Sequence, residues 1–140
     1  MANQRTIGAD TVPDRLRGVR VLVVDDDHDA RTIMKTFLQY LGAGVALAGS
    51  GAEALRVIPS TRPQVIVTMP RGDGYHLLHA LHTTARAWGR IPIIAVTAYG
   101  AAHSEARARA AGFDHWICKP IDLGTFADAV ERLGRLRRAA

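Results

Sequence analysis

Three consecutive carboxylates, Asp25, Asp26 and Asp27, directly follow an apolar run that begins at Val19. Adjacent carboxylates repel each other unless a cation or hydrogen-bond donors compensate. A hard divalent cation such as Mg²⁺, which prefers oxygen ligands, is a natural compensation. The alternative is that Asp27 or Asp29 caps the following helix while the other carboxylates are solvated. These residues alone leave both interpretations open.

The apolar run before these carboxylates is predicted to form a strand. Residues Val21–Val24 are aliphatic without alternation, which is typical of a strand buried on both faces of a parallel sheet. In open α/β sheets, ligands bind beyond the carboxyl ends of the strands, where the strand order reverses. Asp25 and Asp26 are therefore expected at the functional edge of a sheet.

The rest of the chain alternates strand and helix patterns. Further strands are predicted at 45–48, 64–68, 91–96 and 114–118, and helices at about 30–41, 50–58, 73–81, 101–111 and 122–136. In the first helix, apolar residues follow the spacing of a face that covers the sheet: Ala30, Ile33, Met34, Phe37, Leu38 and Leu41. Pro59 and Pro63 are expected to bracket the turn after the second helix. The order predicts an α/β fold, a doubly wound five-stranded parallel sheet of order 2-1-3-4-5 with helices on both faces.

Length and composition indicate one globular domain. The 140 residues are 48% hydrophobic and 22% charged, which excludes disorder. No apolar run approaches the roughly 20 residues of a membrane span. Residues 1–18 lack the apolar core of a signal peptide and are predicted to be a flexible leader, followed by a domain at 19–136 and a basic tail at 137–140. Cys118 is the single cysteine, which fits a reducing, cytoplasmic location, and it is expected to be buried and inert.

The net charge of +5 comes mainly from the carboxyl-terminal end of the chain. Residues 131–140 hold four arginines against one glutamate: Arg132, Arg135, Arg137 and Arg138 against Glu131. A solvated helix terminus is the plain interpretation, because cations suit that end of a helix. Neither a membrane nor a nucleic acid is therefore expected as a partner. If these arginines did bind the phosphates of a nucleic acid, the affinity would fall steeply with salt concentration.

Several short motifs, taken in order, resemble the receiver domain of bacterial two-component response regulators over about residues 19–136. The resemblance implies that Asp25 and Asp26 form the acid pocket, with Asp26 a direct Mg²⁺ ligand. Thr97, at the end of IPIIAVTA, is similar to the switch hydroxyl that contacts the phosphoryl group. Trp116 stands where receivers keep a switch aromatic, and Lys119, before Pro120, resembles the family's invariant lysine. Residues 69–74 (MPRGDG) resemble the Met-Pro-x-x-Asp-Gly that follows the phosphorylated aspartate.

Receivers hold the phosphoacceptor aspartate at the end of the third strand, where this chain has no carboxylate. Counting back from Met69 places that position at Ile66, whereas counting forward from Pro63 places it at Met69 itself. The segment is about three residues shorter than the family pattern. Thr68 is polar, but a hydroxyl cannot form an acyl phosphate. No phosphoacceptor is therefore predicted, and Asp73 is a poor surrogate because it is expected to cap the next helix.

The resemblance implies a stand-alone receiver-like module of phosphorelay signalling that is not phosphorylated and binds Mg²⁺ weakly at most. Two explanations of the shortened segment remain open. The chain is either a degenerate receiver that presents a fixed surface to a partner, or a descendant of a competent receiver that lost a short segment. In both, Lys119 can neutralise Asp25 or Asp26 directly. The expected partner is a histidine kinase or another signalling protein, contacting the fourth helix, fifth strand and fifth helix. The chain is expected to be a monomer or a weak dimer.

Two other interpretations concern metals and catalysis. The same fold could carry a metal-binding or enzymatic module in which Asp25, Asp26 and Lys119 act on a phosphorylated metabolite, but fold alone does not assign function and no glycine-rich phosphate loop is present. Three histidines recur at every third residue of the third helix: His76, His79 and His82. Successive members drift by about 60° around a helix, so they cannot all face one ion and are expected to be solvated.

Overall fold

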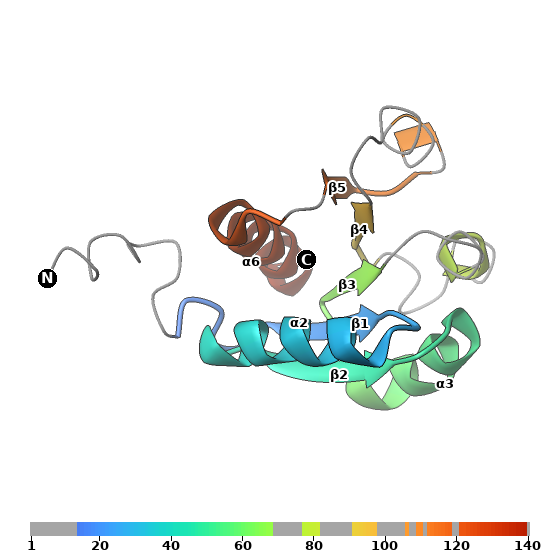
Figure 1. The fold of residues 1–140 in the computed structure, drawn as a ribbon, viewed down its shortest axis with the longest axis horizontal. Coiled ribbons are helices and arrows are strands. Elements are labelled where there is room, and N and C mark those ends of the chain that lie inside the picture. The colour runs from blue at the N-terminus through green and yellow to red at the C-terminus, as the bar shows by residue number, and fades with distance from the viewer. Residues whose placement is uncertain are drawn as a thin grey trace, which may run out of the picture.

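The protein is represented by a computed structural model that describes residues 14–68, 77–81, 91–97, 106, 109–110, 112–118 and 121–139. The side chains of residues 97 and 136–139 lie outside this description. Within these ranges the chain forms one central sheet with helices on its two faces (Figure 1).

Five parallel strands form the sheet in the order β2-β1-β3-β4-β5, which confirms the predicted order and fold class. The strands are β1 (Arg20–Val24), β2 (Gly44–Ala48), β3 (Val65–Thr68), β4 (Ile93–Thr97) and β5 (His115–Cys118). The register pairs Val24 with Ala48 on one side and with Thr68 on the other. The carboxyl ends of the three strands therefore meet at one edge.

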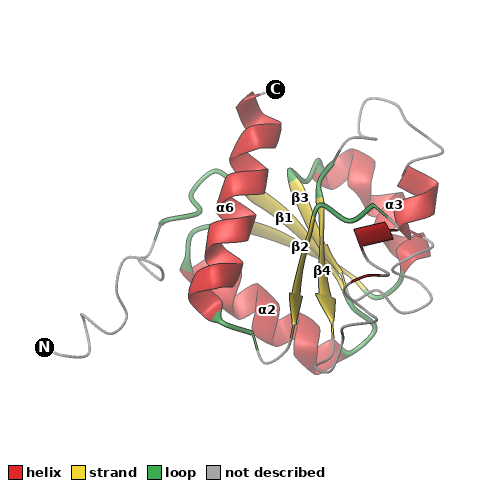
Figure 2. Ribbon diagram, turned by 90° about the horizontal axis from the view of Figure 1, so that it is seen from above, coloured by secondary structure: helices red, strands yellow, loops and turns green. Residues whose placement is uncertain are grey.

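Helices cover both faces of this sheet (Figure 2). They are α2 (His28–Tyr40), α3 (Gly51–Thr61) and α6 (Leu123–Ala139), and residues 77–81 are also helical. The odd-numbered valines of β1 and β3 pack with α2 and α6, whereas Leu22, Val24 and Ile66 pack with α3 and residues 77–81. Alternate residues of a strand point to opposite faces, which explains the division into two cores. Within the described residues, no helix combines the length and the hydropathy needed to cross a membrane.

Side-chain caps begin α3 and α6 where the sequence predicts them. The Ser50 hydroxyl accepts a hydrogen bond from the Glu53 N–H at 3.1 Å. The Asp122 carboxylate accepts from the Gly124 N–H at 3.1 Å and from the Thr125 hydroxyl at 2.8 Å. The bond from Thr125, with smaller contributions from backbone N–H groups, lowers the pKa of Asp122. Such caps satisfy N–H groups that have no partner inside the helix.

The predicted end of the second helix is wrong, because α3 continues through Pro59 to Thr61. A proline inside a helix removes one backbone hydrogen bond. Other donors complete the last turn: the Thr61 hydroxyl donates to the Val57 carbonyl at 2.7 Å, and the Arg62 N–H donates to the Ile58 carbonyl at 2.8 Å. Arg62 then ends the helix in a left-handed conformation, with φ of 49°.

Two apolar side chains are exposed where the sequence predicts burial. Ile33 belongs to the apolar spacing of α2 but is 71% exposed, because it lies at the margin of a stripe whose centre packs through Leu38 and, in part, Met34 and Phe37. Cys118 is exposed rather than buried, because β5 is the edge strand and its inward position is taken by Ile117. Both corrections concern the edges of the packed layers, where periodicity alone does not define the contacts.

Residues 14–18, which the sequence places in a flexible leader, form a turn that packs on the domain. Leu16 is fully buried in the core beneath α2 and α6, and its N–H donates to the Leu41 carbonyl at 2.7 Å. Arg15 forms ion pairs with Asp128 and Glu131 of α6. The packed body therefore begins before residue 19.

The Arg15 and Glu131 pair predicts a pH-dependent part of the stability. The hydrogen bond from the Arg15 guanidinium, aided by Arg135, lowers the pKa of Glu131 below its ordinary value of 4.5. A carboxyl group whose pKa is lowered by folding stabilises the protein above its unfolded pKa, and this stabilisation is lost as the pH falls through the folded pKa. We expect Glu131→Gln to lower the melting temperature at neutral pH by a modest amount, since the Glu131 side chain is 31% exposed. In thermal melts followed by circular dichroism, the difference from wild type should shrink as the pH falls below 4.5, and a constant difference would contradict this account.

Candidate functional site

The three consecutive carboxylates after β1 occupy three different environments. Asp25 is only 8% exposed, its N–H donates to the Ala48 carbonyl at 3.1 Å, and its Oδ1 accepts from the Asp27 N–H at 3.0 Å. Asp26 is exposed. The Asp27 carboxylate caps α2 by accepting from the Asp29 N–H at 3.0 Å. The capping interpretation therefore holds for Asp27, and Asp25 is the carboxylate buried at the sheet edge.

Arg31 is a neighbour of this acid cluster that the sequence analysis did not single out. Its Nη1 donates to the backbone carbonyl of Asp25 at 2.6 Å, and its Nη2 lies 3.5 Å from His28 Nδ1. A methyl group added at Gly49 would approach Arg31 Nη1 to 3.0 Å, so the guanidinium lies close against the loop after β2. The sequence signal that could have identified Arg31 is its spacing, one helical turn after the capping residue Asp27.

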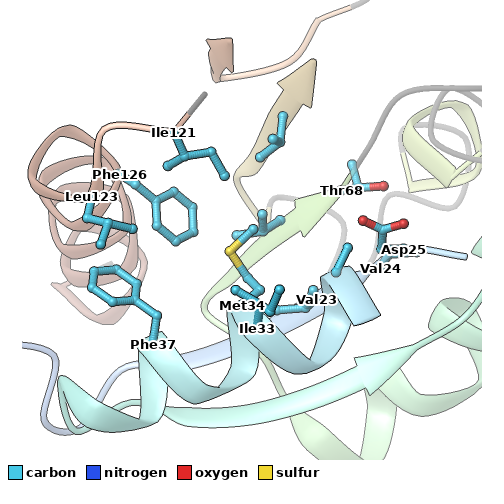
Figure 3. Close-up of a pocket in the computed structure, with 13 residues that line it drawn as sticks. Val23, Val24, Asp25, Ile33, Met34, Phe37, Thr68, Ile121, Leu123 and Phe126 are labelled. Atoms are coloured by element: carbon cyan, nitrogen blue, oxygen red, sulfur yellow. The ribbon is translucent and has the colours of Figure 1, made fainter. Parts of the chain in front are cut away.

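The end of β3 presents a hydroxyl group to the same edge. Thr68 is 2% exposed, and the register places it between Val24 of β1 and Ala95 of β4. Figure 3 draws its hydroxyl and the Asp25 carboxylate at the same end of a pocket that both residues line. Ile66 lies two residues earlier, fully buried in the core on the α3 side. Met69 lies outside the described residues.

The remaining predicted site residues lie at or beyond the ends of β4 and β5. Thr97 is the last residue of β4 and is paired with Cys118, which places its backbone at the same sheet edge as Thr68. Trp116 is half-buried on β5, and the Arg109 guanidinium carbon lies 4.2 Å from its ring centroid. Lys119 and Asp73 lie outside the described residues.

Of the histidines that the structure describes, His28 lies beside the acid cluster, at the start of α2. His79 is exposed, as predicted, whereas His76 and His82 fall outside the description. His115 lies on the edge strand β5, where burial and, to a smaller extent, the positive charge of Arg132 lower its pKa.

A family comparison identifies this arrangement. The family model described as the response regulator receiver domain matches residues 21–131. The chain belongs to this receiver family. The match begins at the second residue of β1, spans the other four strands and reaches into α6.

Individual relatives of this receiver agree with the family assignment. The response regulator MprA of Mycobacterium bovis is 37% identical over 108 residues, which are 75% of this chain but 46% of MprA, so the receiver spans less than half the length of that relative. An uncharacterised 14.6 kDa protein of Leptolyngbya boryana is 33% identical over 105 residues, covering 73% of this chain and 79% of that protein. The receiver domain of Francisella response regulator 1452 has a TM-score of 0.74 and 28% identity, covering 88% of this chain and all of that one. CheY4 of Vibrio cholerae has a TM-score of 0.71 and 27% identity, covering 82% and 98%.

Receiver domains generally bind Mg²⁺ at the phosphorylation site, and this receiver keeps only some of the oxygen ligands that such a site requires. Asp25 and Asp26 supply carboxylates from the end of β1, but neither Ile66 nor Thr68 adds one from β3. Across the described ranges, no three His, Cys, Asp or Glu side chains lie close enough together to hold a metal. Mg²⁺ requires near-ideal octahedral oxygen coordination. Within the described residues, two carboxylates adjacent in sequence, one of which accepts a hydrogen bond from the Asp27 N–H, do not by themselves complete such a shell.

Proposed function

We propose that this chain is a receiver module of two-component signalling that is not phosphorylated at the end of β3 and acts through contacts with other proteins. The observation that carries the proposal is the register at Thr68. Thr68 pairs with Val24, the residue before Asp25, so β3 ends beside the acid cluster without having supplied a carboxylate. The next residue in the sequence, Met69, has no carboxylate either.

The chemistry of phosphoryl transfer supports this proposal. A receiver stores its signal as an acyl phosphate, which needs a carboxylate oxygen as the nucleophile. The Thr68 hydroxyl is neutral at physiological pH and would give a phosphate ester instead. The Asp25 carboxylate accepts a hydrogen bond from the Asp27 N–H. Asp25 follows β1, so it does not stand at the end of β3, where receivers hold the acceptor. The pocket thus keeps acidic groups without the group that receives the phosphoryl.

Receiver domains are generally signalling domains that interact with histidine kinases or other signalling proteins. For this chain we propose the contact surface that the sequence predicts, of which the structure describes β5 and α6, whereas most of the predicted fourth helix at 101–111 lies outside the described residues. Supporting observations are the edge position of β5, the exposed Cys118 and the Arg109 guanidinium stacked over Trp116. No observation at the site favours the enzymatic alternative.

Incubation with acetyl phosphate and Mg²⁺, followed by intact-mass spectrometry, tests the loss of phosphorylation. We expect the wild-type chain to gain no phosphoryl adduct, because β3 ends without a carboxylate. An insertion variant with Asp-Leu-Leu between Thr68 and Met69 restores both the length and the acceptor, and should gain one adduct. The matched control inserts Ala-Leu-Leu at the same place and should gain none.

Two further variants identify the source of any adduct on the wild-type chain. A stoichiometric adduct that survives Asp73→Asn but is lost in Asp26→Asn would overturn the proposal, since it would require a functional acid pocket. Isothermal titration of the wild type with Mg²⁺ should give weaker binding than titration of the Asp-Leu-Leu variant. The restored carboxylate is the reason for that difference.

A further inference from the structure

An apolar pocket lies on the α2 and α6 side of the sheet, next to the acid cluster. Its volume is about 180 Å³, and its walls come from α2, the ends of β1, β3 and β4, and the first residues of α6. Figure 3 shows Met34, Phe37, Ile121 and Phe126 around its interior. Two residues of its wall, Ile33 and Leu123, are 71% and 47% exposed, so the pocket lies at the surface of the domain.

One end of the pocket is polar and the rest is apolar. Asp25 and Thr68 line the polar end, and they are 8% and 2% exposed. Among the described residues, the Asp25 carboxylate accepts one hydrogen bond, from the Asp27 N–H to Oδ1. A carboxylate has two oxygens and about four acceptor sites. Asp25 therefore retains acceptor capacity in a largely buried setting, where an additional donor is worth more than in water.

We propose that this pocket binds a small cationic amphiphile, consisting of an apolar group about the size of one ring and an ammonium or amidinium group that donates to the Asp25 carboxylate. The volume supports a group of this size, since apolar cavities of about 150 Å³ bind benzene. The charge supports a cation, because the Asp25 carboxylate lines the polar end of the pocket, and the Nη1 of Arg31 donates to the Asp25 backbone carbonyl rather than to this carboxylate. The partial positive charge of the α2 N-terminus is met by its cap, Asp27.

This site is additional to the proposed function and does not depend on it. The ligand would contact α2, the sheet and α6 together, beside the direct packing of Phe37 on Phe126, whose ring centroids are 6.2 Å apart. Its test contains no phosphoryl donor. A failure of ligand binding and an unexpected phosphorylation are therefore separate results.

Three fragments of similar size and different charge test the proposal on the whole chain: benzylamine, benzyl alcohol and phenylacetate. The readout is the methyl resonance of Met34 in a protein labelled at its methionine methyl groups. We expect benzylamine to shift this resonance saturably and to bind about tenfold more tightly than benzyl alcohol, the difference of one charge-assisted hydrogen bond. Phenylacetate should bind the weakest. Asp25→Asn should remove the preference for benzylamine over benzyl alcohol.

A pair of matched variants tests the location of binding. Ala30→Leu places bulk in the pocket wall on α2 and should abolish the benzylamine shift. Ala52→Leu makes the same change at an exposed position of α3 and should leave the shift unchanged. Circular dichroism melts establish that both variants fold. Equal binding of phenylacetate and benzylamine would overturn the proposal, and so would retained benzylamine binding in Ala30→Leu. A Met34 shift that depends on protein concentration alone would also overturn it, because it would indicate that a second copy of the chain occupies the pocket.

Discussion

The substitution Leu16→Ala is expected to lower the free energy of unfolding by about 2 to 5 kcal/mol. Leu16 is fully buried among the α2 and α6 core residues, and its N–H donates to the Leu41 carbonyl. Truncation to alanine removes apolar contacts and leaves a cavity that the sheet and two helices cannot fully close. Urea unfolding followed by circular dichroism measures the loss as a lower midpoint with an unchanged slope.

Ile33→Ala is the matched control for this prediction. The sequence pattern assigns Ile33 to the core face of the first helix and Leu16 to a flexible leader, whereas the structure reverses both assignments. Ile33 is 71% exposed, so its truncation should change the free energy of unfolding by no more than about 0.5 kcal/mol. A larger loss for Ile33→Ala than for Leu16→Ala would contradict the packing of residues 14–18.

The substitution Gly134→Ala is expected to destabilise the protein by about 1 to 3 kcal/mol, although alanine is the better helix former. A methyl group at Gly134 would lie 2.7 Å from Val19 Cγ1, closer than atoms can approach without a shift. Val19 is fully buried where the chain enters β1, so α6 has to move away from the sheet. Helix propensity alone predicts that Gly134→Ala raises the free energy of unfolding by about 1 kcal/mol. The steric overlap with Val19 makes the expected change a loss of stability instead.

A double-mutant cycle with Val19→Ala tests this explanation. Removing the Val19 methyl groups opens space for the new methyl, so the double variant should lose less stability than the sum of the two single variants. Gly44→Ala is the control, because the nearest atom to its added methyl is Arg20 Cγ at an ordinary 3.9 Å. If the stability changes of the two single variants simply add in the double variant, or if Gly134→Ala stabilises the protein, then α6 does not pack tightly against Val19 at Gly134.

Local sequence signals predicted the strands, the order of the sheet and the helices α2, α3 and α6. The strands are short apolar runs and the helices begin at recognisable caps, Asp27, Ser50 and Asp122, because capping and burial depend on residues close together in the chain. The end of α3 was harder to predict. Pro59 is a stop signal in sequence, but side-chain donors such as the Thr61 hydroxyl complete the turn beyond it.

The candidate site could be predicted only in part. The run of three aspartates placed carboxylates at the sheet edge, but nothing in it distinguished the buried Asp25 from the exposed Asp26. Arg31 was missed because its partner is a backbone carbonyl, which carries no residue type. The pocket beside Asp25 was also invisible in the sequence, since its walls come from strands and helices far apart in the chain.

By itself, the sequence determined an α/β receiver-like fold, the acidic end of β1 and the absence of aspartate from residues 64–69. The tertiary structure decided which positions meet. Pairing between β1 and β3 places Thr68 beside Val24 and Ile66 inside the core. It also placed Leu16 in the core and Ile33 in solvent. The reason is physical: strand register and helix packing are set by contacts between residues distant in sequence, and no local pattern encodes which of those contacts a side chain makes.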